Sequence, residues 1–335
     1  MKKSTTFKTI LRIIGIIAII AIIGFAITAC DNSGDKGGDE WDGIFTNLED
    51  VSNYLGSQEQ NTSDSPYTIK INISTFPENF YDTFGNKDDY FGNRGRYVIL
   101  DFSSSTFKKI SSNSFSKKIE AQHFIYYINN KYIVGIILPD SVTIIEKSAF
   151  DSCTSLNSVT IGNGVEGITM ATFRYCTSLN SVTIGRGVTY ISSNAFFGCT
   201  SLASVNIPNN VTYIGTKAFY NCTSLTSITI GSGVNKIYES AFLGTSLTSV
   251  TIPNSVTSIG HSAFACDTLT SVTFQGMIPF ENFGSDEFIS GYGVIRNNSP
   301  FLGDLRELFF TGAVWGIGTY TRNALVNGNS VWTKQ

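Results

Sequence analysis

A repeat of 23 residues dominates this sequence. Each copy opens on a leucine and continues with the same order of apolar and polar positions, as in LNSVTIGRGVTYISSNAFFGCTS. A fixed period of this length is typical of a solenoid, because one such coil cannot bury its apolar face alone and needs stacked neighbours. The opening leucines are spaced by 23 residues and, in the last two steps, by 22: Leu156, Leu179, Leu202, Leu225, Leu247 and Leu269.

Within each copy, the order of side chains describes one strand followed by turns. Leu156, Val159 and Ile161 alternate with Ser158 and Thr160, which is the period-two pattern of a strand with one buried face. A phenylalanine then recurs at the far side of each coil: Phe173, Phe196, Phe219, Phe242 and Phe264. We therefore expect a β-rich solenoid with a parallel sheet on its concave face and an irregular or short helical convex side.

The same pattern extends in both directions beyond the clearest copies. Val98–Phe102 and Ile133–Leu138 fit earlier strands, and Leu305 to Phe310 fits a last one. We assign residues 96–311 to the solenoid, with nine strand-bearing coils. The segment 276–304 breaks the period and is interpreted as an irregular insertion.

Both ends of a solenoid need caps, because an open end exposes the core. We assign residues 41–95 to an N-terminal capping region and residues 312–335 to a C-terminal cap. In the first of these, Trp41 to Leu55 carries apolar residues at helical spacing and stops at Gly56, which predicts a helix. A strand is expected from Tyr67 to Ile73.

The N-terminus has the composition of an export signal. Residues 1–29 hold four basic residues and no acidic one, and their apolar run from Ile13 to Ala26 would rise only about 22 Å as a helix, short of the roughly 30 Å hydrocarbon core. The following Ile27-Thr28-Ala29-Cys30 resembles the lipobox of bacterial lipoproteins, which implies cleavage before Cys30 and acylation of its sulfur. The alternative is an uncleaved membrane anchor with an incidental Cys30.

Residues 30–40 are small, polar and acidic, as expected for a flexible tether. Removal of the four basic residues of the signal segment leaves 19 basic and 26 acidic residues, a formal net charge of −7. Nucleic-acid binding needs a basic surface, so nucleic acid is excluded as an expected partner.

A literal G-x-G-x-x-G, formed by Gly162, Gly164 and Gly167, raises the question of a dinucleotide site. The next copies repeat Gly-x-Gly without the third glycine, and others place Pro-Asn at the same position. A cofactor site occurs once per domain, whereas this feature recurs with the repeat. We therefore interpret the glycines as turn residues and expect no cofactor.

The repeats resemble the BspA-type leucine-rich repeats of bacterial surface proteins. The phrases that carry the resemblance are CTSLNSVTIGRGVTYISSNAF and CTSLTSITIGSGVNKIYESAF. The resemblance implies a leucine-rich-repeat coil and a cell-surface protein that binds host or microbial macromolecules, often called an adhesin. The chain departs from the general leucine-rich pattern at the turn, where Gly or Asn-Ser replaces an Asn or Cys ladder.

Residues that could carry chemistry are few. A column of cysteines, one per coil, is interpreted as buried free thiols rather than disulfides, and no C-x-x-C pair for zinc is present: Cys153, Cys176, Cys199, Cys222 and Cys266. His123 and His261 have no partner set by spacing, and there is no G-x-S-x-G motif. We expect no enzyme, no catalytic residue and no metal site.

Two surfaces are candidates for recognition. The concave face presents columns of serine and threonine, represented by Ser204, Ser227 and Thr229; the alternative is that these small residues serve strand stacking alone. The insertion 276–304 is rich in aromatic residues, and Phe283 and Tyr292 are its candidate ligand contacts. These rings could instead cap the end of the core.

The sequence thus predicts an exported, lipid-anchored binding module at the outer membrane or cell surface, with proteins or glycans of a host or of other microbes as partners. A structural envelope protein without a specific host ligand is the alternative, and an enzyme is a distant one.

Overall fold

The computed structural model describes the repeats and parts of both flanks. The described residues are 44–46, 51, 54, 62–77, 97–121, 124–129, 132–279, 282, 301, 317–322 and 332–335. Residues 1–43, which include the predicted signal segment and tether, lie outside them. Among the described residues, no helix is long and apolar enough to cross a membrane.

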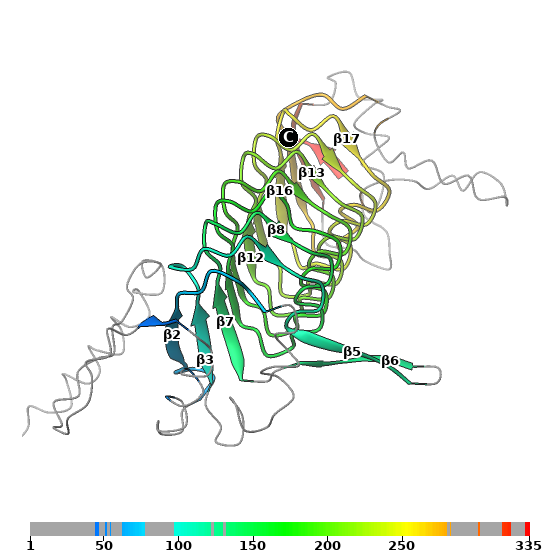
Figure 1. Ribbon diagram of the computed structural model, residues 1–335. Coiled ribbons are helices and arrows are strands. Elements are labelled where there is room, and N and C mark those ends of the chain that lie inside the picture. The colour runs from blue at the N-terminus through cyan, green and yellow to red at the C-terminus, as the bar shows by residue number, and fades with distance from the viewer. Residues whose placement is uncertain are drawn as a thin grey trace, which may run out of the picture. The chain divides into compact units, whose positions relative to one another are not determined.

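One side of the coil is built of parallel strands, as predicted (Figure 1). This strand face begins with β1 (Ile44–Phe45), β2 (Tyr67–Ile71), β3 (Val98–Asp101), β7 (Ile133–Ile137), β9 (Ser158–Thr160) and β10 (Ser181–Thr183), which pair in that order. It continues with the pair β12 (Ser204–Asn206) and β14 (Ser227–Thr229), and then with β16 (Ser249–Ile252) and β18 (Ser271–Phe274). The inward valine of β9, Val159, is 2% exposed, and the period-two pattern therefore places the core on one side of these strands.

A second, narrower ladder follows the first turn of each coil. Its strands are two residues long: β4 (Lys109–Ile110), β8 (Ile144–Ile145), β11 (Tyr190–Ile191), β13 (Tyr213–Ile214), β15 (Lys236–Ile237) and β17 (Ser258–Ile259). β4 pairs with β8, and β11, β13, β15 and β17 pair in that order, all in parallel. The second residue of each strand is an isoleucine that points inward and is buried.

The remaining side of the coil is irregular, which is one of the two conformations expected for the convex side. The other expectation, short helices, was wrong for the described repeats. In five successive coils, two residues have a positive φ there, as Asn194 (57°) and Gly198 (71°) do on either side of Phe196. A helix needs consecutive right-handed residues, so these left-handed positions prevent one.

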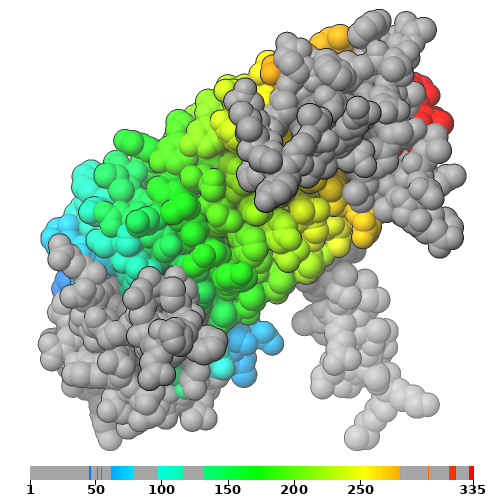
Figure 2. All heavy atoms as spheres, turned by 90° about the vertical axis from the view of Figure 1, so that its right-hand side faces the viewer, coloured from blue at the N-terminus to red at the C-terminus, as the bar shows by residue number. Residues whose placement is uncertain are grey.

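The interior is filled by ladders of identical side chains (Figure 2 shows the packed coils from outside). The predicted phenylalanine column is fully buried and stacked face to face, with ring centroids 4.5–5.3 Å apart and planes within 18° of parallel. The column runs from Phe115 to Phe264 and ends on Phe301. Each stacked pair contributes about 0.5–1.5 kcal/mol beyond the burial of its area.

The N-terminal edge differs from the prediction. The helix expected over Trp41–Leu55 was wrong at its start, because Ile44 and Phe45 form β1 and pair with Lys70 and Ile71. Val51 and Tyr54 do have helical backbone. The open edge of β2 carries unpaired backbone groups, and pairing with β1 satisfies them while burying Phe45 to 5% exposure.

The C-terminal edge of the strand face is covered by an antiparallel pair. β19 (Gly318–Arg322) pairs with β18 and with β20 (Trp332–Lys334), and both lie in the segment assigned to the C-terminal cap. Tyr320 and Trp332 are buried at 0% and 1% exposure. The strand expected at Leu305 to Phe310 lies outside the described residues.

A hairpin that the sequence reading did not anticipate interrupts the solenoid. β5 (Ser116–Ala121) and β6 (Phe124–Asn129) pair antiparallel between the coils that contain β3 and β7. In Figure 1 the hairpin runs away from the stacked coils. It accounts for the separation between Val98 and Ile133, which is longer than one repeat.

Candidate functional site

The strand face brings the predicted serine and threonine columns together in register. Ser204 pairs with Ser227, and Asn206 pairs with Thr229, on the neighbouring strands β12 and β14. The same pairing joins Ser158 with Ser181 and continues along the coil. The three candidate residues Ser204, Ser227 and Thr229 are all exposed. The structure therefore places them side by side on one outward surface.

The hydroxyl groups of these three candidate residues are free for other contacts. Within the part of the chain that the structure describes, the side chains of Ser204, Ser227 and Thr229 make no hydrogen bond. The threonines beside the second ladder behave differently: Thr189 Oγ1 donates to the carbonyl of Glu166 (2.8 Å), and Thr212 Oγ1 donates to that of Thr189 (2.9 Å). One threonine column thus ties coil to coil, whereas the column on the strand face does not.

Of the aromatic insertion 276–304, the structure describes residues 276–279, 282 and 301. Phe283 and Tyr292 lie outside the described residues, as do Cys30 and His123. Phe301, which belongs to the same segment, is 2% exposed and stacks on Phe264 at 5.3 Å. At this one position the aromatic side chain caps the core.

Two surface ladders of aromatic rings were missed by the sequence reading. Tyr190 and Tyr213 stack with ring centroids 5.6 Å apart and planes 8° from parallel, and Phe197 and Tyr220 stack at 4.9 Å. Their 23-residue spacing is the signal that would have found them. Tyr213 is stacked against Tyr190 and meets Tyr238 edge to face at 5.9 Å, so its ring faces are occupied by neighbouring coils.

The cysteine column lies in the core with free thiols. The Sγ atoms of Cys176, Cys199 and Cys222 each donate to the carbonyl of the phenylalanine in the preceding coil, at 3.1 Å. Burial raises the pKa of the Cys222 thiol to about 12 and raises that of Cys199 well above its usual range. A neutral, enclosed thiol is a poor nucleophile and metal ligand, so this column has a structural role.

Of the two buried carboxylates among the described residues, Asp101 accepts a hydrogen bond from the backbone N–H of Ser103 (2.9 Å), and Asp151 is paired with a cation. Arg174 Nε donates to both carboxylate oxygens of Asp151, at 3.2 and 3.0 Å, and Asp151 has no exposed surface. The two residues are one repeat apart, so the pair links neighbouring coils. Among the described residues, no group of three or more His, Cys, Asp and Glu side chains could hold a metal ion.

Comparison with known proteins identifies the repeats. A family model described as "BspA type Leucine rich repeat region (6 copies)" matches residues 117–216 and 189–292, which together span just over half of the chain. A comparison with curated proteins finds no match.

Several solved structures are similar in part. A leucine rich cell surface protein from Faecalibacterium prausnitzii A2-165 is 34% identical over 50% of this chain and 47% of its own, with a TM-score of 0.40. A leucine rich repeat protein of T. pallidum is 26% identical over 48% of this chain and 80% of its own (TM-score 0.42), and a pneumococcal vaccine antigen is 22% identical over 51% and 36% (TM-score 0.34). The chain spans about half the length of the first of these proteins.

The family match covers the coils whose strands, turns and phenylalanine ladder are described above. The chain belongs to the BspA type leucine-rich repeat family.

Proposed function

We propose that this chain is an exported, lipid-anchored binding module that recognises a protein or glycan of a host or of another microbe, as an adhesin does. The observation that carries the proposal is the strand face, where exposed hydroxyl groups in register, such as those of Ser204 and Ser227, have no partner among the described residues. A rigid scaffold with an unused polar surface is suited to recognition, because little entropy is lost when the surface binds.

In this proposal, residues 1–29 are removed as a signal peptide, Cys30 carries the lipid, and residues 30–40 tether the solenoid to the outer membrane or cell surface. Two or three acyl chains anchor a protein stably, where one chain is marginal. The acidic net charge of the remaining chain does not favour attachment to anionic lipids, so the acyl chains would supply the anchoring.

A structural envelope protein is the second candidate. It is favoured by the composition of the strand face, because the columns of Ser204 and Thr229 contain no Tyr, Trp or Arg, the side chains that dominate most protein interfaces. The catalytic alternative has no comparable support: the matched family model describes a repeat, and the thiols of the described coils are buried and neutral.

A screen of the purified chain against immobilised extracellular matrix proteins and host cell-surface glycoproteins tests the proposal. We expect saturable binding of at least one ligand. Absence of any ligand, together with loss of envelope integrity when the gene is deleted, would establish the structural alternative instead.

A further inference from the structure

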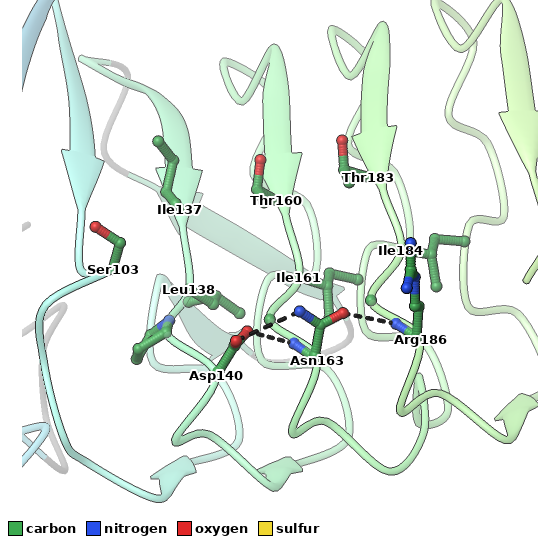
Figure 3. Close-up of a pocket in the computed structure, with 13 residues that line it drawn as sticks. Ser103, Ile137, Leu138, Asp140, Thr160, Ile161, Asn163, Thr183, Ile184 and Arg186 are labelled. Carbon is green, nitrogen blue, oxygen red and sulfur yellow. Dashed lines mark hydrogen bonds between the residues drawn. The ribbon is translucent and has the colours of Figure 1, made fainter. Parts of the chain in front are cut away.

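A pocket of about 420 Å³ opens where three neighbouring strands, β7, β9 and β10, end and enter their turns (Figure 3). It does not include Ser204, Ser227 or Thr229, but Thr160 and Thr183, from earlier strands of the same outward threonine column, line it. Its walls come from three successive coils and one residue of the coil before: Ser103, Ile137, Leu138, Pro139, Asp140, Thr160, Ile161, Gly162, Asn163, Thr183, Ile184, Gly185 and Arg186.

A chain of hydrogen bonds fixes the rim of this pocket. Asp140 accepts hydrogen bonds from the backbone N–H of Asn163 (Oδ1, 2.7 Å) and from its side-chain amide (Oδ2, 3.3 Å). The Asn163 Oδ1 atom accepts in turn from the backbone N–H of Arg186 at 3.0 Å. Each of the three residues occupies the same position of its turn, one repeat apart. The rim is therefore preorganised across three coils.

Arg186 is the only cation among the residues that line the pocket. Its side chain is exposed, and within the described residues its guanidinium group makes no hydrogen bond or ion pair. Figure 3 shows this side chain running back from the turn beside Ile184. A planar guanidinium with unused donors matches a carboxylate, which it can bind through two parallel hydrogen bonds.

The carboxylate of Asp140 does not cancel this preference. Strands in a sheet are about 4.8 Å apart, so two coils separate Asp140 and Arg186 by roughly 10 Å, about one Debye length at physiological salt. Both oxygens of Asp140 are already engaged by Asn163. A carboxylate oxygen has a second lone pair, so Asp140 can still accept a hydrogen bond from a ligand hydroxyl.

The other walls suit a ring that carries several hydroxyl groups. The hydroxyls of Thr160, Thr183 and Ser103 each donate and accept, as a sugar hydroxyl does. Ile137 and Ile184 supply an apolar surface for the C–H face of such a ring. Together with the free guanidinium, the geometry points to a site for a sugar acid, a saccharide ring with a carboxylate, whose charge pairs with Arg186. The assignment does not depend on what the strand face around Ser204 binds.

Glucuronate and glucose are a matched pair of probes, because they differ only in the carboxylate. Binding of each to the purified full chain is followed by titration calorimetry and by saturation-transfer NMR. We expect millimolar binding of glucuronate, at least tenfold weaker binding of glucose, and at least a tenfold loss of glucuronate binding in Arg186→Gln. Lys217→Gln removes a cation from another side of the coil and should leave binding unchanged.

Two further measurements make the test decisive. The melting temperature of Arg186→Gln should equal that of the parent chain, since its guanidinium has no partner among the described residues. Acetate should displace bound glucuronate only when its concentration is at least tenfold higher than that of glucuronate. The assignment is wrong if the parent chain does not bind glucuronate, if Arg186→Gln binds it equally well, or if acetate competes as effectively as the sugar acid.

Discussion

The ring of Tyr190 lies over the backbone of Gly167 so closely that a Cβ added at Gly167 would come within 2.2 Å of the ring Cζ atom. This contact explains the third glycine of the apparent nucleotide-binding motif. The first two glycines have a related cause, since a Cβ at Gly162 or Gly164 would meet backbone oxygens of Pro139 or Asp140 at 2.3 and 1.9 Å. The glycines of this motif are therefore explained by the close packing of neighbouring coils, which leaves no room for a Cβ.

The first prediction uses this contact. Gly167→Ala should lower the free energy of unfolding by about 1–3 kcal/mol, the usual cost of overpacking. In the background of Tyr190→Ser, which removes the ring, the same change should cost less than about 0.5 kcal/mol. Urea denaturation of the four variants measures the coupling. Equal costs in both backgrounds would show that the ring is not the obstacle.

The second prediction concerns a buried alanine in a left-handed conformation. Ala171 has a φ of 57°, where a Cβ is unfavourable by about 1 kcal/mol, so Ala171→Gly should leave stability unchanged or raise it slightly. Ala195 is equally buried but has no positive φ, and Ala195→Gly should cost about 1 kcal/mol. Thermal unfolding compares the two. Similar losses in both variants would contradict the assigned backbone conformation.

The third prediction concerns the thiol column. Alkylation followed by mass spectrometry should find five free repeat cysteines that react only after denaturation, because each lies in the core. A linked pair, such as Cys176 with Cys199, would contradict this arrangement.

The same thiols make stability depend on pH. The pKa of the Cys222 thiol is about 12 in the folded chain and about 8.5 when unfolded, so its contribution is complete below pH 8.5 and is lost as the pH rises toward 12. Within this window, each such thiol lowers the free energy of unfolding by up to about 1.4 kcal/mol per pH unit. Urea midpoints at pH 7.5, 8.5 and 9.5 should fall less steeply in Cys222→Ala than in the parent chain. Parallel curves would show that Cys222 ionises equally in both states.

The fourth prediction tests the lipid anchor. Cells that express Cys30→Ala and are fed labelled palmitate should incorporate no label into the protein and should accumulate an unprocessed precursor. The parent chain is the positive control. Normal labelling of the variant would remove the lipoprotein assignment and leave the uncleaved anchor.

The sequence was sufficient for the features that recur in every coil. The inward Leu156 and Val159, the outward Ser158 and Thr160, and the Phe173 column were predictable because one period repeats them and burial enforces it. Features that occur only once in the chain were not predictable in this way. The pairing of Phe45 with Ile71 overrode a helical pattern because an open sheet edge needs a partner, and this is a tertiary effect that local periodicity does not contain.

The candidate sites also differ in whether the repeat alone predicts them. The alignment of Ser204 with Ser227 follows from the period and was predicted, whereas the pocket beside Arg186 was not. Only the glycines of the repeated Gly-x-Gly, which flank Arg186, were interpreted from the sequence, as turn residues. The column that Arg186 shares with Asp140 and Asn163 is visible in the sequence, but the depth of the pocket depends on how three coils stack.

The central claim, recognition through the strand face, is tested most directly by one binding measurement on a ligand from the screen. Ser204→Glu with Ser227→Glu places two charges on paired positions of that face. Ser193→Glu with Thr216→Glu places two charges on adjacent coils elsewhere, at a repeat position where the next coil already has Glu239, and Phe283→Ala with Tyr292→Ala alters the insertion. Melting temperatures are measured alongside, because loss of a buried Phe costs about 3–5 kcal/mol and would mark Phe283 as a cap. We expect the first pair alone to abolish binding while the fold remains. Binding that survives the charges at Ser204 and Ser227, or that is lost equally in the Ser193 and Thr216 control, would contradict the claim.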